Sequence, residues 1–555
     1  MKRTILLISA LVLSGAVQAQ TGSKNAVVNV ENDYNPEVIE VRKKNLTPSD
    51  ETNTDNTPMT LMFSKSGKAY NGFTSETDIS DILPKKEGVF PGYVRLGYGL
   101  TNDIDAKAAY RLSTGKNGAL KAYAGFNGYK TDVDHLFATE KPWNSRMFNT
   151  IAGIGYSYRF KALTLGIDGA FKNSTFNYQC TDNVITPLTD KQDGQSYRLA
   201  ISGTSNPIGA LSYSFNGDIE YIARSYSSGQ KAPIGEMRYG VGGSIGYEVV
   251  SDYLKSFGIG LHLDAFSYNS TLRKANSGYG NYFSIDADPY LDFTFGKWAV
   301  GIGTKMNIIT RGNGFFAIAP NIKVESHLNK NITLFGYITG GRTNNSFAKL
   351  NSITPYWGFV ENGDFRLKPT YRIVDAGIGS RISFDALSIG LNAGYAFTKD
   401  DLLETLQQQS QDQFTLMYVN FKQENTHHAF VDLRLGYDLR SWLKLSADAR
   451  YDLWSCNDKN LLVMKPLFTV DANAEIRVLR HLTLRAGYNF TRYTKSSTQG
   501  RLSNKNDLYA RISCQINKRI GAYIQGNNLL NCKYFEYAGY ATRGIRGSLG
   551  ATVNF

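Results

Sequence analysis

Apolar and polar residues alternate with a period of two along most of the chain, from about Tyr93 to the last residue, Phe555. Between positions 443 and 453, leucine, alanine and tyrosine occupy the odd positions, and charged or polar residues occupy the even ones. The pattern recurs at 431–438, 470–478 and 482–490. This periodicity predicts β-strands with one apolar and one charged face. A soluble sandwich can show it on a few strands. Because no second apolar layer appears, lipid outside and water inside is the simpler explanation.

The connections between these predicted strands alternate in length, as they do between the periplasmic turns and extracellular loops of outer-membrane barrels. The short connections are Lys161-Ala162, Phe384-Asp385-Ala386, Leu439-Arg440-Ser441, Leu479-Arg480 and Asn517-Lys518-Arg519. The long ones are Lys130–Arg146, Lys172–Gln195, Gly341–Thr370, Asp400–Gln413, Cys456–Met464, Thr494–Asn506 and Asn531–Arg543. We therefore predict an all-β fold, a transmembrane antiparallel β-barrel of about 22 strands over residues 91–555. This count requires Leu416–Asp438 to be one long strand, because splitting it would give 23 strands and break the alternation.

The N-terminus has the pattern of an export signal. Lys2 and Arg3 precede the apolar run Ile5–Leu13, and small residues then lead to Ala19. We predict that residues 1–19 are a signal peptide cleaved after Ala19, the alternative being a buried N-terminal element. The chain is then expected in the cell outer membrane, with residues 20–90 as an acidic, partly flexible periplasmic segment.

The last strand supports this assignment. Leu549, Ala551, Val553 and Phe555 alternate with polar residues, and the chain ends on the aromatic Phe555. Such an ending resembles the signal by which outer-membrane barrels are delivered to the barrel assembly machinery, which we therefore expect as a partner.

Composition narrows the class of protein further. The chain has 555 residues, of which 42% are hydrophobic and 20% charged, which excludes general disorder. No long apolar run follows the N-terminus, so a helical membrane protein is excluded. Four cysteines are too few for a disulfide scaffold, and Cys514 lies on the apolar face of a predicted strand.

The positive charge is unevenly distributed. The whole chain has 61 Lys+Arg and 48 Asp+Glu, a net charge of +13, while residues 21–90 hold 8 and 11. Subtracting these and Lys2 and Arg3 leaves 51 against 37, or +14, for the barrel. The longest basic run is Arg42-Lys43-Lys44, so we expect no nucleic-acid partner. A charged lumen and contact with anionic outer-membrane lipids explain the excess better.

Candidate chemistry is sparse. His427 and His428 point to opposite strand faces, which makes them poor joint metal ligands. The glycines near Gly240 stand in a β-pattern without a following helix, so a phosphate loop is not indicated, and no G-x-S-x-G motif suggests a hydrolase. We predict no catalytic residues, no metal and no cofactor. The ligand-binding residues stay undetermined.

Aromatic residues near predicted strand ends favour interfacial girdles. They are Tyr156, Tyr158, Phe160, Tyr488, Phe490, Trp442 and Trp454. For the loop residues Tyr356 and Trp357 two interpretations remain open: stacking on a sugar or siderophore, and loop packing, which we favour.

Three segments of the last 200 residues or so carry recognisable motifs. The first holds Asn351, Pro355-Tyr356, Phe365–Pro369 and Asp375-Ala376-Gly377. The second holds Tyr395, Asp400–Leu403 and Tyr418-Val419-Asn420, and the third Asn527–Asn531, Lys533-Tyr534 and the closing strand. Together these segments resemble the barrel of TonB-dependent receptors, of a Bacteroidetes type, although Thr370 and Asp375 stand where that family usually has glutamates. The resemblance implies a plugged receptor barrel.

The family's N-terminal plug domain is not recognisable here, and only Glu37–Val41 faintly resembles an energy-coupling box. A barrel of this size normally has a plugged lumen. We therefore expect inward-folded loops, a partner protein or the acidic N-terminal segment to fill or cap it, since an acidic segment would be attracted into a basic lumen.

Transport of a solute or larger ligand across the outer membrane is the leading prediction. The alternative is a non-transporting barrel scaffold that docks surface lipoproteins or periplasmic partners for assembly or secretion. An enzyme is the third and least supported possibility.

Overall fold

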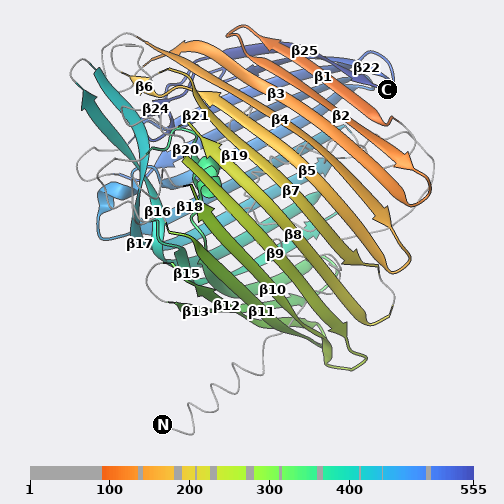
Figure 1. The fold of residues 1–555 in the computed structure, drawn as a ribbon. Coiled ribbons are helices and arrows are strands. Elements are labelled where there is room, and N and C mark those ends of the chain that lie inside the picture. The colour runs from red at the N-terminus through yellow and green to blue at the C-terminus, as the bar shows by residue number, and fades with distance from the viewer. Residues whose placement is uncertain are drawn as a thin grey trace.

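The structure is a computed structural model in which a closed antiparallel barrel is formed by strands that each pair with their neighbours in sequence (Figure 1). It describes residues 90–134, 142–180, 190–206, 209–225, 234–269, 280–311, 315–358, 367–411, 414–439, 442–495 and 502–555. The large sheet has 23 strands, of which the two-residue β6 lies apart, so that 22 form the wall. The first and last strands close the ring, with Val94 opposite Val553. The predicted fold class is confirmed.

The first half of the wall is formed by strands of 8 to 17 residues. They are β1 (Gly92–Gly99), β2 (Ile104–Thr114), β3 (Gly118–Val133), β4 (Trp143–Arg159), β5 (Leu163–Phe176), β7 (Gln192–Ser205), β8 (Leu211–Arg224), β9 (Ile234–Glu248), β10 (Leu254–Tyr268), β11 (Tyr282–Phe295) and β12 (Trp298–Ile309).

The second half contains the two longest strands, β16 and β17. The wall continues with β13 (Phe316–His327), β14 (Ile332–Thr343), β15 (Thr370–Phe384), β16 (Leu387–Gln411), β17 (Phe414–Leu439), β18 (Leu443–Ser455), β19 (Pro466–Leu479), β20 (Leu482–Tyr493), β21 (Lys505–Gln515), β22 (Ile520–Asn527) and β25 (Arg546–Asn554). Outside the wall lie β6 (Gln179–Cys180), β23 (Phe535–Tyr537), β24 (Tyr540–Ala541), the helix α4 (Phe347–Ile353) and the 3-10 turn η1 (Lys459–Leu462).

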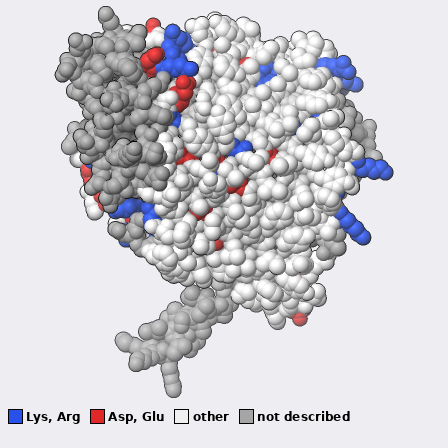
Figure 2. Space-filling model, viewed as in Figure 1, with Lys and Arg blue, Asp and Glu red and all other residues white. Residues whose placement is uncertain are grey.

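The two faces of the wall differ as the alternation predicts. Leu96, Ile378 and Leu549 are 59%, 73% and 65% exposed on the outer face, where lipid would cover them. The neighbouring Arg95 points inward and forms an ion pair of 2.6 Å with Asp105. Figure 2 shows an outer face that is largely free of charged side chains. The barrel is therefore an outer-membrane barrel, with an apolar outside and a polar inside.

Short turns gather at one end of the barrel, and the described chain begins and ends there. The amide of Gly92 donates to the carbonyl of Phe555 at 2.8 Å, and that of Phe555 to Gly92 at 3.0 Å. The predicted short turns that the structure describes in full lie between wall strands at this end; residues 440–441 of the turn after Leu439 are outside the described residues. In the turn after β15, Asp385 has a φ of 42°, a conformation that aspartate tolerates well. The single long strand predicted near Leu416–Asp438 is confirmed as β17.

One predicted loop is wrong. Asp400–Gln413 is not a long loop, because β16 continues to Gln411 and pairs with β17 along its whole length. A β-bulge interrupts the register between Thr398 and Asp401, where Asp400 has a φ of 52°. The strand continues past the bulge because β17 offers it an unbroken row of backbone partners, and the polar, glutamine-rich sequence does not reveal this pairing.

Trp454 is a second correction. It lies near a strand end as predicted, but on the inner face, where its ring stacks on His428 at 3.7 Å between centroids. It is therefore not part of an outer girdle, while Trp442 and Phe160 are exposed near the short turns as expected. His428 binds Asp452 at 2.7 Å inside, and His427 contacts Tyr395 outside, so their predicted opposite orientation is confirmed.

The remaining elements agree with the sequence-based expectations where the structure describes them. Cys514 is exposed on the outer apolar face beside Ile512, and none of the four cysteines forms a disulfide. No helix within the described ranges is long and apolar enough to cross a membrane. The predicted signal peptide with Ala19 and the segment 20–90, including Glu37–Val41, lie outside the described residues except for residue 90.

Candidate functional site: the packed outer loops of the barrel

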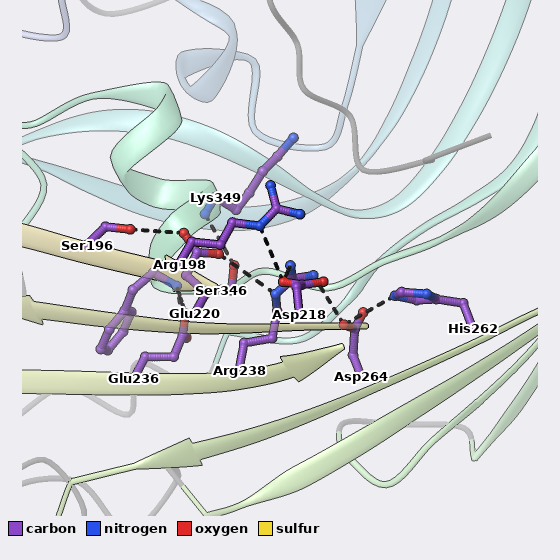
Figure 3. Close-up of polar contacts among 11 residues, drawn as sticks. Ser196, Arg198, Asp218, Glu220, Glu236, Arg238, His262, Asp264, Ser346 and Lys349 are labelled. Atoms are coloured by element: carbon purple, nitrogen blue, oxygen red, sulfur yellow. Dashed lines mark hydrogen bonds and ion pairs between the residues drawn. The ribbon is translucent and has the colours of Figure 1, made fainter. Parts of the chain in front are cut away.

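The connection between β14 and β15 folds back over the inner side of the barrel and carries the short helix α4 (Figures 1 and 3). The Ser346 hydroxyl accepts from the Lys349 amide at 3.2 Å and caps the first turn. Pro355 follows just after Thr354, and proline cannot extend a helix. The Glu236 carboxylate on the inner face of β9 accepts from the Phe347 amide, with both oxygens within 3.0 Å. This contact attaches the helix to the wall.

Next to α4, aromatic side chains form a buried cluster, which we call the mouth cluster. They come from the connections β3–β4, β5–β7, β14–β15 and β22–β25 and from the strand ends beside them. Its members are Trp143, Phe176, Tyr178, Phe347, Tyr356, Trp357 and Tyr540. Tyr356 stacks on Tyr540 with ring centroids 3.9 Å apart, and Trp143 meets both rings edge-on. Aromatic pairs of this kind contribute roughly 0.5–1.5 kcal/mol each beyond the area they bury.

Arg224, at the outer end of β8, is the cation at the centre of the mouth cluster. Its guanidinium lies 4.3 Å from the Trp357 ring and 4.8 Å from the Phe176 ring, and only 2% of the residue is exposed. It donates to the Tyr178 hydroxyl at 3.0 Å and to the Pro355 carbonyl. One wall strand thus fixes both the 355–357 segment and the end of β5.

The mouth cluster is also attached to the long β16–β17 hairpin. The Val419 amide donates to the Tyr356 carbonyl at 2.8 Å, and the Gly358 amide donates to the Val419 carbonyl at 3.0 Å. The Tyr540 hydroxyl donates to the Met417 carbonyl at 2.6 Å. All three family-like segments of the sequence therefore meet at the outer mouth, although the third begins more than 100 residues after the second.

Burial alters the ionisation of groups in these connections. Burial raises the pKa of the Tyr178 hydroxyl, which the neighbouring Arg224 partly offsets. Burial also lowers the pKa of the Lys349 ammonium, and nearby Arg372 lowers it further. Both directions are those expected where water is largely excluded. The described parts of these connections thus form a packed layer at the outer end of the barrel, which we call the cap. What fills the lumen stays a prediction.

Below the cap, charged side chains line the inner wall and are mostly paired. Arg238 on β9 reaches Asp218 at 2.5 Å, Asp264 at 3.2 Å and Glu220 at 3.8 Å, and His262 also contacts Asp264 (Figure 3). Similar pairs join Glu475 to the neighbouring strand. This gives the lumen a wall of fixed charges of both signs, which can attract and guide a polar or charged solute.

The predicted site residues fall in different places. Leu549, Ala551, Val553 and Phe555 are all exposed on the outer face, as their alternation requires. Their role in assembly stays a prediction. Tyr356 and Trp357 are buried inside the cap, where they pack against other loop residues rather than facing an open site.

Arg224 and Glu236, which attach the cap to the wall, were not among the predicted site residues. Each is one more polar residue at an inward position of an alternating strand, so no local signal separates it from the other lumen residues. Within the described residues, no group of three or more His, Cys, Asp or Glu side chains is placed to hold a metal ion.

Solved structures with the same architecture include a mutant of the ferric enterobactin receptor from Pseudomonas aeruginosa in complex with enterobactin. It is 12% identical, the match covers 84% of this chain and 81% of that one, and the TM-score is 0.63. The barrel of this chain has the same fold as the barrel of that receptor. The FrpB iron transporter from Neisseria meningitidis matches at 10% identity, over 86% of this chain and 83% of that one, with a TM-score of 0.64.

The copper transporter OprC matches at 11% identity over 85% of this chain and 82% of that one, with a TM-score of 0.60. At such low identity these matches establish the fold alone. The names of these three proteins are those of receptors and transporters rather than enzymes. No protein-family model and no curated protein matches the sequence. That the chain is of a Bacteroidetes type stays a prediction.

Proposed function

We propose that this protein is an outer-membrane receptor that moves a solute or larger ligand through its lumen, with the inward-folded outer loops acting as a gate. The observation that carries the proposal is the cap itself. Among the described residues, Arg224 and Glu236 attach these packed connections to the wall of a charge-lined barrel through polar contacts. A cap held in this way can be released at one edge without unfolding the wall.

The packing of the mouth supports a gate rather than a rigid lid. α4 has only seven residues, too few to be stable alone, so its conformation depends on its contacts with β8 and β9. A ligand that binds the opened cap more tightly than the closed one would shift the population toward the open state. The names of the similar structures suggest a metal ion or a metal chelate as the ligand.

The acidic segment 20–90 is the proposed second barrier. Its net charge of −3 over residues 21–90 (8 Lys+Arg against 11 Asp+Glu) is opposite to that of the barrel. Long-range attraction would favour its entry into the lumen from the periplasmic end. Energy coupling through TonB would require a coupling sequence in this segment, for which Glu37–Val41 is the candidate.

The test is purification in a mild detergent followed by conductance measurement in planar bilayers. We expect an isolated barrel with rare openings, and higher conductance when residues 21–88 are deleted. Unchanged conductance after the deletion would show that this segment is not the plug. A stoichiometric co-purifying lipoprotein or periplasmic protein, with no conductance in any variant, would instead favour the scaffold function and contradict transport.

A further inference from the structure

The wall has a local opening between β13 and β14 near its outer end. The last paired residues are Asn321 and Thr339, whereas β13 continues to Phe316 beside β12 alone. Pro320 has no amide hydrogen to offer to a neighbouring strand, and pairing stops next to it. On the other side, a β-bulge turns β14 away, with Gly341 at a φ of +135° that only glycine adopts readily.

This opening is a cleft of about 340 Å³. Its far side is β15, whose Tyr371 hydroxyl donates to the carbonyl of Ile318 at 2.6 Å. Phe316 and Ile318 line the cleft and are 54% and 50% exposed on the outer face of the wall. The cleft therefore reaches the outer face of the wall, while Lys368 and Pro369 on its other side belong to the connection that carries α4.

Basic side chains dominate the polar lining of the cleft. The charged residues around it are Arg311, Arg342, Lys368, Lys399 and Asp400. The Lys368 ammonium lies 3.4 Å from Asp400, the Arg311 guanidinium donates to the Tyr268 hydroxyl at 3.0 Å, and the Arg342 guanidinium donates to the Asn307 side-chain carbonyl at 3.2 Å. The four cations and one carboxylate give the lining a net charge of +3. Arg342, Tyr371 and Lys399 stand directly opposite one another on three adjacent strands, so they form one row across the sheet.

The position of this row determines which ligand it can meet. It lies at the loop end of the wall, where the outer leaflet of an outer membrane places its headgroups, and its apolar lining continues onto the lipid-facing surface. Guanidinium and ammonium groups bind phosphate oxygens strongly. We propose that the cleft binds the phosphate group of an outer-leaflet glycolipid, with an acyl chain lying along Phe316 and Ile318.

Free phosphate shares this chemistry, and the experiment separates the two sources. The purified full-length protein in detergent is titrated with bisphosphorylated lipid A, with its dephosphorylated form and with inorganic phosphate, and bound species are counted by native mass spectrometry. The test variant is Lys368→Gln with Lys399→Gln. The matched control is Lys330→Gln with Lys518→Gln, which removes the same charge from exposed positions in the turns at the opposite end.

We expect lipid A to bind the native chain and the control equally. Each lysine near an anionic headgroup contributes about five-fold, so the test variant should bind about 25-fold more weakly. The dephosphorylated lipid should bind as weakly to the native chain as lipid A binds to the test variant. Unchanged heat-modifiable migration on gels confirms that both variants are folded barrels.

Equal binding of lipid A to the test variant and the control would overturn the proposal. Equal binding of the dephosphorylated lipid would also overturn it, because the phosphate would then have no role. If millimolar inorganic phosphate displaces lipid A completely and binds the native chain alone, the cleft is a site for a free anion, and the lipid assignment fails.

Discussion

Replacing Arg224 by methionine should open the cap while leaving the wall intact. Methionine keeps an apolar stem against Phe176 and Trp357 but removes the guanidinium that contacts the Tyr178 hydroxyl and the Pro355 carbonyl. Since these contacts belong to the closed cap, the substitution acts on the closed state alone. Backbone pairing of β8 with its neighbours does not involve the side chain.

The size of the effect follows from these contacts. A desolvated cation over a tryptophan contributes about 2 kcal/mol. A buried carbonyl left without its donor costs about 1–3 kcal/mol, while the Tyr178 hydroxyl keeps its bond to the Trp357 carbonyl at 2.8 Å. Burying the guanidinium costs desolvation energy, and the methionine variant no longer has this cost, which offsets part of the lost stabilisation. A net destabilisation of about 3 kcal/mol corresponds to roughly 100-fold more open cap.

Tryptic cleavage after Lys349 measures the open population directly. Lys349 lies within α4, so the protease can cut there only when the helix leaves the wall. When opening and closing are fast relative to cleavage, the rate follows the fraction of open molecules. The cleavage rate, followed by mass spectrometry of the fragments, should therefore rise about 100-fold in the variant.

The matched control is Arg198→Met, which removes a cation from the inner wall below the cap. Arg198 stands four residues from Gly194, the partner of Arg224, or about 13 Å along the strand. Its substitution should leave cleavage after Lys349 unchanged. A folded Arg224→Met variant whose cleavage rises less than about five-fold, or no more than that of Arg198→Met, would refute the idea that Arg224 holds the cap.

Three further predictions concern the anchor, the lumen and the last strand. Glu236→Gln should raise the rate of cleavage after Lys349 by about five-fold, since a hydrogen bond to a charged acceptor is worth about 1 kcal/mol more than one to a neutral acceptor. An unchanged cleavage rate would exclude Glu236 as an anchor of the cap. Arg238→Met, made in the Arg224→Met barrel, leaves Asp218 and Asp264 without the cation that they share. The reversal potential measured in a salt gradient should therefore shift toward cation selectivity. A shift toward anion selectivity would contradict this prediction. Phe555→Ala should lower the amount of folded barrel in the outer membrane several-fold, while the purified variant still refolds in detergent. Equal amounts of the variant and the native barrel in the outer membrane would argue against an assembly signal.

The alternation of side chains was enough to predict the wall. A strand between lipid and water must present one apolar and one polar face. The residues of each strand therefore show the alternation by themselves, and every strand of the wall repeats it. The same logic identified β17 as one strand, placed Cys514 on the apolar face, and placed His427 and His428 on opposite faces. It also shows why Trp454 was misplaced: its position at a strand end was considered, whereas its even position in an odd-outward strand places it inside.

The sequence by itself therefore determined the barrel, its strand number and the end at which the long connections lie. Only the tertiary structure decided how those connections pack, because the mouth cluster joins residues such as Arg224, Trp357 and Tyr540 that are more than a hundred positions apart. The extension of β16 beyond Asp400 was equally non-local, since it depends on the backbone of β17 rather than on its own polar side chains. Periodicity reports the solvent on each side of a strand, and it carries no information about which loops meet.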